Sequence, residues 1–412
     1  MSTSRKAAQK EVRIGMVGVG GRGTFLMRTL LSIPGVKVNA IADQNGINAG
    51  RAAGFVKAAH GNDPALYVGG PKKFEELCAR EDLDAVVASG PWETHVPVAV
   101  AAMKHGKYAA TEVPAAVTVK ECWDLVDTSE RTGMPCMMLE NVCYFQNVLT
   151  VLRMVRENCF GELVHMEGGY QHDVRFTKIS KEGQLKWRGA HSVHSDGNLY
   201  PTHPIGPIAQ YANINRGDVF THLVSMSSKS RGIADFAATL LGKKHPLAKK
   251  KYALGDINTS LIKSHNGVTV TLYHDTNLPR PYDLIFRVQG VKGLYMGTVD
   301  GVYIDGKSPK EHQYEPFAPF MKKYKHPLWE SLKKEAIKNG GHGGCDYVTL
   351  HEFVRAVRNK TQTPIDVYDS ATWSVITPLS VESVKKGSAP VKFPDFTRGK
   401  WRTRKPLPLK GY

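Results

Sequence analysis

The sequence predicts an α/β protein of two domains, the first built on a doubly wound parallel sheet and the second an α+β domain with an open, mostly antiparallel sheet. Two patterns along the chain predict this class. Short apolar runs alternate with helical patterns over the first 140 residues, whereas strand-like runs follow one another with little helix after about residue 160. A chain of 412 residues is also too long for one comfortable hydrophobic core.

The first 140 residues are typical of consecutive βαβ units. Buried strands are predicted at residues 12–18, 36–42, 84–89, 107–111 and 135–139. Helices with an apolar face are predicted at residues 24–32, 94–105 and 118–131. Strands joined by helices in this way pair in parallel, so their carboxyl ends share one edge of the sheet.

The later part of the chain is typical of an open antiparallel sheet. Strands are predicted at residues 163–171, 222–227, 258–265, 268–274, 283–289 and 299–305. Asn266-Gly267 predicts a hairpin turn between two of them. Helical patterns return at residues 345–358 and 368–385, and a basic, Pro-rich tail follows that we expect to wrap over the surface. The predicted segments are a polar arm (1–11), the first domain (12–145), the second domain (146–385) and the tail (386–412).

The formal charge of +17 would suit nucleic acid, an anionic surface or an acidic substrate. The basic residues are spread along the chain, however, and no helix-turn-helix, zinc-finger or RNP pattern accompanies them. We therefore favour a solvated basic surface and expect no nucleic-acid partner. No run approaches the roughly 18 apolar residues that a membrane span needs. The six cysteines form no Cys-x-x-Cys pair, so neither a disulfide framework nor a metal site is expected.

A glycine-rich turn carries the clearest functional signal. Gly18-Val19-Gly20-Gly21-Arg22-Gly23 lies between an apolar strand and an apolar helix, and Asp43 ends the next strand. Gly18 allows a tight turn, Gly20 lets the backbone approach a pyrophosphate, and Gly23 permits close packing of helix on strand. The helix N-terminus offers free N–H groups to phosphates. This combination predicts a Rossmann dinucleotide-binding domain, and the Asp43 carboxylate favours NAD over NADP because it repels a 2′-phosphate.

Two further segments fall where the fourth and fifth strands end, on the edge at which such sheets bind ligands. They are Pro91-Trp92-Glu93-Thr94-His95 and Glu112-Val113-Pro114. Both are candidates for the wall of the cofactor site. The alternative from pattern alone is that Trp92 is a core aromatic residue and His95 begins a helix without touching any ligand.

These residues resemble the glucose-fructose oxidoreductase / inositol dehydrogenase superfamily, in which a Rossmann domain precedes a largely antiparallel second domain. Ordinary members carry Glu-Lys-Pro where this chain has Glu112-Val113-Pro114. The change from Lys to Val removes a charged group from the junction of cofactor and substrate. The Val113 substitution therefore argues against simple dehydrogenase chemistry.

Segments in the second half narrow the match, and the chain is similar to glycoside hydrolase family 109 over about residues 12 to 396. The segments that carry this likeness are Gly197-Asn198-Leu199-Tyr200-Pro201-Thr202-His203, Pro279-Arg280-Pro281-Tyr282, His326-Pro327-Leu328-Trp329 and Gly340-Gly341-His342-Gly343-Gly344. The resemblance implies an NAD-dependent glycosidase with α-N-acetylgalactosaminidase activity. Members often carry a twin-arginine export leader. The polar N-terminus of this chain predicts a cytoplasmic protein, and an exported protein whose leader has been removed is the alternative.

The resemblance also implies a reaction and a set of roles. The sugar is oxidised at C3 with bound NAD, the aglycone is eliminated after loss of the C2 proton, water adds, and C3 is reduced again. His203 is the candidate base for the 3-hydroxyl, Tyr200 for the C2 proton, and His342 the acid for the leaving oxygen. The residues that line the sugar or cofactor pocket would be Asn141, Tyr170, Arg188, Pro201, Thr202 and Tyr282.

Two other readings stay open from the sequence. One is an NAD-linked sugar oxidoreductase on the same scaffold. The other is a nucleotide-binding or nucleic-acid-associated module without catalysis, suggested only by the net charge. By analogy with the superfamily we expect a homodimer or larger oligomer that forms through the open sheet, because an exposed apolar sheet face is otherwise a liability.

Overall fold

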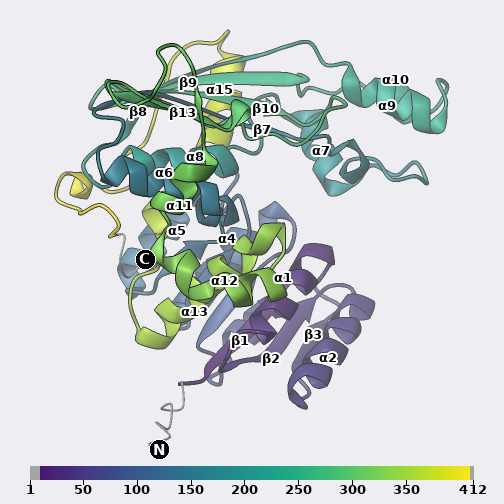
Figure 1. Ribbon diagram of the computed structural model, residues 1–412. Helices are drawn as coiled ribbons and strands as arrows, with labels where there is room; N and C mark the ends of the chain where they lie inside the picture. Colours follow the sequence, from purple (N-terminus) through teal and green to yellow (C-terminus); the bar gives the residue numbers. More distant parts are fainter. Residues whose placement is uncertain (1–9, 409–412) are drawn as a thin grey trace, which may run out of the picture.

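The computed structural model describes residues 10–408 and contains two sheets (Figure 1). Residues 1–9 of the predicted arm and 409–412 of the predicted tail lie outside the described residues. The first sheet has the strand order β3-β2-β1-β4-β5-β6, and every pair of neighbours is parallel. Its strands are β1 (Val12–Val17), β2 (Val36–Asp43), β3 (Ala65–Val68), β4 (Ala85–Ala88), β5 (Tyr108–Thr111) and β6 (Cys136–Met138).

Helices connect these strands in the right order for a Rossmann domain. They are α1 (Gly21–Leu31), α2 (Gly46–His60), α3 (Lys73–Cys78), α4 (His95–Lys104) and α5 (Val119–Thr132). Strands β4 and β5 are buried along their whole length, as expected where helices cover both faces of a parallel sheet. Successive strands are added on one side of β1 as far as β3 and on its other side from β4 onward, so the strand order switches between β1 and β4. Such sheets bind ligands at this switch point.

The second sheet has nine strands in the order β14-β13-β12-β11-β7-β10-β9-β8-β15. They are β7 (Leu163–Gln171), β8 (Phe220–Ser227), β9 (Ile257–Ser264), β10 (Thr269–Asp275), β11 (Arg287–Gly290), β12 (Gly293–Met296), β13 (Gly301–Ile304), β14 (Glu315–Pro316) and β15 (Val391–Lys392). All neighbours are antiparallel except β7 and β10. The β9–β10 hairpin turns at Gly267, whose φ is 95°. The predicted fold class and this hairpin are confirmed.

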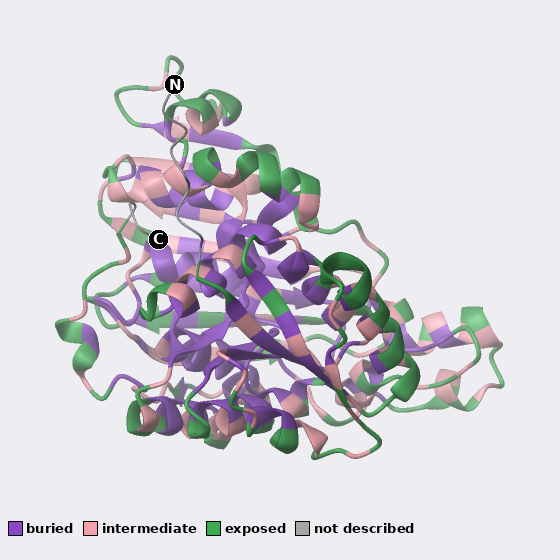
Figure 2. Cartoon of the chain, turned by 90° about the horizontal axis from the view of Figure 1, so that it is seen from below, coloured by how far each residue is buried: buried purple, intermediate pink, exposed green. Residues whose placement is uncertain are grey.

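The chain after residue 145 adds further helices, and some of them lie between the two sheets. Figure 1 shows α6 and α8 under the nine-stranded sheet, on the side that faces the Rossmann sheet. Buried residues run through this middle region, and exposed residues lie mainly on outer helices and loops (Figure 2). The helices are α6 (Gln146–Arg156), α7 (Trp187–His194), α8 (Thr202–Tyr211), α9 (Gly232–Leu241), α10 (Pro246–Lys249), α11 (Ala318–Lys323), α12 (Pro327–Asn339), α13 (Cys345–Asn359), α14 (Val367–Ser374) and α15 (Ile376–Lys385).

Two helices near the C-terminus return to the Rossmann sheet. Helix α13 packs against α1 and β1, and α14 packs against α5 and β6. The C-terminal segment is also tied to the first domain, since Arg398 forms ion pairs with Asp127 and Glu130 of α5. The two predicted domains are thus interleaved in space, and the predicted limits of the four segments stay predictions.

Within residues 10–408, no helix is both long and apolar enough to cross a bilayer. The same stretch holds no group of three or more His, Cys, Asp or Glu side chains placed to bind a metal ion.

Candidate active site

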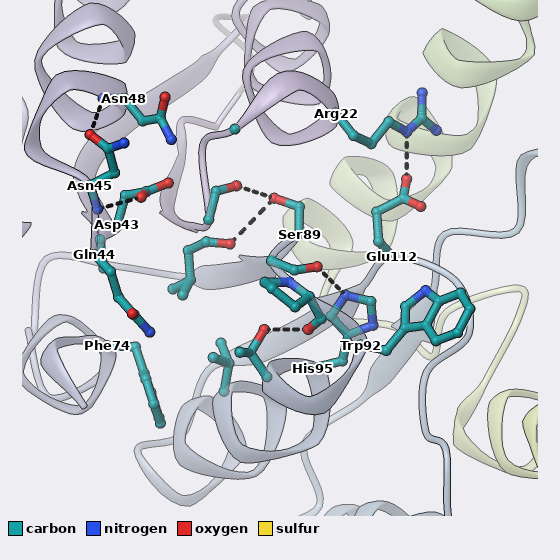
Figure 3. Close-up of a pocket in the computed structure, with 18 of the residues that line it drawn as sticks. Arg22, Asp43, Gln44, Asn45, Asn48, Phe74, Ser89, Trp92, His95 and Glu112 are labelled. Atoms are coloured by element: carbon teal, nitrogen blue, oxygen red, sulfur yellow. Dashed lines mark hydrogen bonds and ion pairs between the residues drawn. The ribbon is translucent and has the colours of Figure 1, made fainter. Parts of the chain in front are cut away.

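The glycine-rich turn lies at the head of a cleft of about 500 Å³ (Figure 3). Gly18 has a φ of +82°, and a Cβ there would come within 2.6 Å of the Gly90 backbone nitrogen. A Cβ on Gly23 would lie 1.9 Å from the Gly18 carbonyl oxygen, so α1 can approach the strand only with glycine at that position. Gly20 and Gly21 have nothing within 4 Å of such a Cβ and line the cleft. They leave the room that a pyrophosphate needs at the start of α1, and the turn therefore fits a dinucleotide.

Asp43 stands at the carboxyl end of β2 with its carboxylate fixed by the backbone (Figure 3). One oxygen accepts a hydrogen bond from the Val19 N–H at 2.7 Å, and the other accepts from the Asn45 N–H at 2.8 Å. Asn45 in turn caps α2. This position on the cleft wall is the one at which an acidic residue meets the hydroxyls of an adenosine ribose.

The opposite wall comes from the ends of β4 and β5. The lining here includes Trp92, Thr94, His95, Glu112 and Val113, and their contact with a cofactor stays a prediction. The His95 ring is completely buried between the carbonyl oxygens of Pro114 (2.8 Å) and Gly90 (3.1 Å), and burial lowers its pKa.

The predicted residue Glu93 does not line the described cleft. It points outward, and its carboxylate lies 2.9 Å from His191 Nε2. Gly23 and Asn141 are likewise absent from the lining, the first because it lies inside the turn and the second because its amide faces another group.

That other group is Asp346, which the sequence analysis missed. It lies in the first turn of α13 with a side chain only 1% exposed, and it gathers three candidate site residues. Arg22 donates to its Oδ1 at 2.8 Å and Asn141 at 2.9 Å, while His342 Nδ1 donates to its Oδ2 at 2.7 Å. Burial alone would raise the pKa of this carboxyl, but hydrogen bonds from His342 and Arg22 hold it well below its usual range.

Arg22 extends this network to the cofactor cleft. Its Nε donates to Glu112 Oε1 at 2.8 Å (Figure 3), so one guanidinium bridges the end of β5 and the start of α13. These contacts join the first turn of α1 and the end of β5 to the second glycine-rich turn, residues 340–344, which carries His342. The side chain of His342 is 60% exposed on this turn. Its backbone and those of Gly343 and Gly344 have φ angles of 51°, 71° and 100°, a left-handed run that glycine tolerates best.

His203 has a buried carboxylate partner, Glu140, that the sequence analysis also missed. His203 sits in the first turn of α8, and its Nδ1 donates to Glu140 Oε1 at 2.6 Å. Glu140 is fully buried at the end of β6, and the same oxygen accepts from the Val142 N–H. With Nδ1 held in this way, the neutral ring carries its lone pair on Nε2, which is the arrangement of a general base oriented by a carboxylate.

An aromatic cluster surrounds His203. Tyr200 and Tyr170 have ring centroids 5.0 and 5.3 Å from the His203 ring, and they lie 4.6 Å from each other. Burial raises the pKa of Tyr200 well above its usual value and that of Tyr170 to about 12, while the charge of Arg188 acts against both shifts. The Arg188 guanidinium lies over the Trp92 and Tyr200 rings, which links this cluster to the cofactor cleft.

Tyr282 and His172 complete the cluster on its open side. The His172 ring lies 4.9 Å from that of Tyr282, and its Nδ1 is 3.0 Å from the Tyr170 hydroxyl. Burial, followed by the positive charges of His203 and Arg188, lowers the pKa of His172. The remaining two predicted substrate residues, Pro201 and Thr202, are buried beneath the cluster at the start of α8.

A Rossmann cleft, connected through Arg188 and Tyr200 to a buried carboxylate–imidazole pair, places this protein in the class of NAD-binding enzymes. Comparison with known families agrees. Residues 12–140 match the oxidoreductase family with an NAD-binding Rossmann fold, and residues 144–403 match the C-terminal domain of glycosyl hydrolase 109. The chain belongs to glycosyl hydrolase family 109. The predicted family, the glycosidase class and NAD as the cofactor are confirmed.

Similar proteins are related over nearly their whole length. An α-N-acetylgalactosaminidase of Tannerella forsythia is 46% identical, with 96% of this chain and 88% of the relative covered. A glycosyl hydrolase family 109 protein of Parabacteroides distasonis is 45% identical, with 98% and 91% covered. Among solved structures, a levoglucosan dehydrogenase in complex with NADH and levoglucosan has a TM-score of 0.71 at 19% identity, covering 93% of this chain and 100% of that one. At that identity the likeness concerns the fold alone.

Proposed function

We propose that this protein hydrolyses terminal α-linked N-acetylgalactosamine with NAD as a bound, regenerated cofactor. The observation that carries the proposal is the His203–Glu140 pair with Tyr200 beside it. Arg188, whose guanidinium lies over the Tyr200 ring, connects this pair to the cofactor cleft. The 46% identical relative named α-N-acetylgalactosaminidase supports the choice of sugar. Bound NAD supplies a reversible hydride acceptor for C3 of the sugar.

His203 and Tyr200 are the proposed proton acceptors. His203 Nε2 takes the proton of the 3-hydroxyl while Glu140 stabilises the imidazolium that forms. The resulting 3-ketone acidifies the C2 hydrogen, and Tyr200 is assigned to that proton. Burial raises the pKa of Tyr200, so its phenol must first lose its own proton to solvent before the phenolate can accept the C2 proton. The Arg188 guanidinium, 5.6 Å from the ring centroid, stabilises that phenolate.

His342 is the proposed acid for the leaving oxygen. Its Nδ1 donates to Asp346, so the protonated ring presents Nε2–H on the exposed side of the turn. The sugar is proposed to lie against Tyr170 and Tyr282. The residues proposed to hold or border the cofactor are Gly18, Gly20, Gly21, Arg22, Asp43, Trp92, Thr94, His95, Glu112, Val113, Asn141 and Arg188. Glu93 is not proposed to touch the cofactor. Its proposed role is to position His191, whose ring lies against Trp92.

Turnover in heavy water tests the reaction. Cleavage of a nitrophenyl α-N-acetylgalactosaminide should place deuterium at C2 of the released sugar without net formation of NADH. A double-carboxylate glycosidase leaves C2 untouched, so release of sugar with only protium at C2 would contradict the proposal. Net NADH formation with free sugar would instead indicate the sugar oxidoreductase.

We further propose that the protein forms a homodimer or larger oligomer through the open face of the nine-stranded sheet. Met226 of β8 and Leu261 of β9 project from this face and are 64% and 56% exposed in the single chain. Neighbouring apolar side chains on an uncovered sheet face favour a contact with a second copy.

A further inference from the structure

A second, smaller pocket lies behind the aromatic cluster. Its volume is about 20 Å³, and Tyr170 and Tyr200 line it. Trp92 and Arg188 line both this pocket and the cofactor cleft. It therefore adjoins the proposed sugar site on the side of Tyr200. A volume of this size admits about one or two water-sized groups and excludes a sugar ring.

One wall of the pocket is polar and incompletely satisfied. Ser192 Oγ and His274 Nδ1 are buried there without a hydrogen-bond partner in the described part of the chain. Lys178, which is 5% exposed, donates to Thr276 Oγ1 at 2.7 Å and Asn277 Oδ1 at 2.6 Å, both neutral acceptors. Burial, and then the charge of Arg188, lowers the pKa of its ammonium group to about 7. Unsatisfied buried donors of this kind stabilise an acceptor atom that enters the pocket.

The other wall is apolar. Val174, Leu199 and Leu254 are buried and line the same space. A group that fits both walls needs an acceptor oxygen beside a small apolar end. The acyl end of an acetamido group has this composition, because its carbonyl oxygen and methyl carbon are bonded to the same atom and point apart.

We propose that this pocket is the subsite for the acyl group of a 2-acylamino sugar. The inference rests on the proposed function, in which C2 of the sugar lies against Tyr200. The acyl oxygen accepts from Ser192 and Lys178, and the methyl group packs on the apolar wall. The positive charge of Arg188, joined by that of Lys178 when its amine is protonated, rejects a sugar whose C2 carries a free ammonium group.

Three nitrophenyl α-galactosides that differ only at C2 test the subsite. For the unmodified enzyme we expect kcat/KM to fall from 2-acetamido to 2-hydroxy to 2-amino. Ser192→Val fills the pocket and should lower kcat/KM for the 2-acetamido sugar by about 10-fold or more, as expected when a group is lost from a fitted pocket. The 2-hydroxy sugar, which does not enter the pocket, should change less than about 2-fold on the same reasoning. Ser195→Val, three residues further along, is the matched control because Ser195 does not line the pocket.

The outcomes separate the two proposals. If Ser192→Val slows both sugars equally while bound NAD and the thermal midpoint stay normal, the subsite is wrong and the glycosidase stands. If Ser192→Val is poorly folded, Ser192→Ala replaces it and should raise KM for the 2-acetamido sugar alone. If the unmodified enzyme cleaves none of the three, the proposed function fails. The subsite is then judged by calorimetric binding of N-acetylgalactosamine against galactose to the NAD-loaded protein, where equal binding would overturn it.

Discussion

At the residue scale, the two buried carboxylates decide how the candidate histidines are used. Glu140 holds His203, and Asp346 holds His342, at 2.6 and 2.7 Å. Both histidines are predicted from the sequence, and neither carboxylate is. Glu140 is 63 positions from His203, and among 38 acidic residues no local pattern distinguishes it. Asp346 lies two residues after the glycine-rich run ends at Gly344, but its partners Arg22 and Asn141 are far away in sequence, so only the fold brings them together.

Glu140→Gln tests the first pair. The amide oxygen can still accept from His203 Nδ1, but the negative charge that stabilises the imidazolium is gone. We expect kcat to fall by about 10²-fold, within the range that general acid–base catalysis contributes, with little change in KM. Bound NAD per chain, measured after denaturation, should stay normal. Loss of NAD together with activity would mean that Glu140 supports the cofactor site instead of His203.

Asp346→Asn and His342→Ala form a matched pair on the second network. Both should slow natural sugar-linked substrates by about 10²–10⁴-fold and barely affect a nitrophenyl glycoside, whose phenolate leaves without an acid. Only Asp346→Asn should also lower NAD retention, because it removes the buried charge that faces Arg22. Kinetics on the two leaving groups check the first effect. Equal losses on both substrates in His342→Ala would remove the acid role.

At the scale of elements, the N-terminus of α1 offers a clean test of the cofactor cradle. A Cβ at Gly20 meets no atom within 4 Å and projects into the cleft, so Gly20→Val should fold normally and lose most of its bound NAD. Gly23→Ala places a Cβ 1.9 Å from the Gly18 carbonyl oxygen and should instead lower the thermal midpoint markedly. Released NAD, measured beside thermal unfolding, separates the two. Normal NAD content in Gly20→Val would contradict the assignment of the cradle.

The elements predicted well from the sequence are those in which the apolar pattern and the turn residues at the ends indicate the same limits. Strand β7 has the predicted limits, and β9 and β10 differ by one residue at each end because the Asn266-Gly267 turn fixes their register. Helix α2 was not predicted, and three glycines (Gly46, Gly50 and Gly54) interrupt its sequence pattern. Strands β3 and β12 were also missed. Each has only four residues, and pairing with neighbouring strands defines it as a strand more than its own composition does.

At the scale of the whole molecule, the open sheet face predicts assembly. If two copies meet there, Leu261→Lys should shift the protein toward a monomer without loss of bound NAD, because Leu261 projects away from the cofactor cleft and is 56% exposed. Light scattering at micromolar concentration gives the mass. A monomer of the unmodified protein would end the idea.

The interleaving of the two domains could not be read from the sequence. Helices α13 and α14 follow strands β7 to β14 of the second sheet in the chain but pack on the first sheet, so a division by position along the chain misses this arrangement. The helical pattern of residues 345–358 was recognised, yet a pattern of apolar positions shows that a helix has a buried face and not which sheet covers it.

The bridge from Arg22 through Asp346 to His342 limits how this scaffold can be recombined. A chimera that takes residues 12–140 from another NAD-binding protein would receive the glycine-rich turn and most of the wall of the nucleotide cleft. Unless the donor also has arginine at position 22, the Asp346 carboxylate would be buried opposite a missing cation, and the turn that carries His342 would lose its anchor. Exchange of the two halves between lineages is therefore expected to succeed only when this arginine and this aspartate travel together.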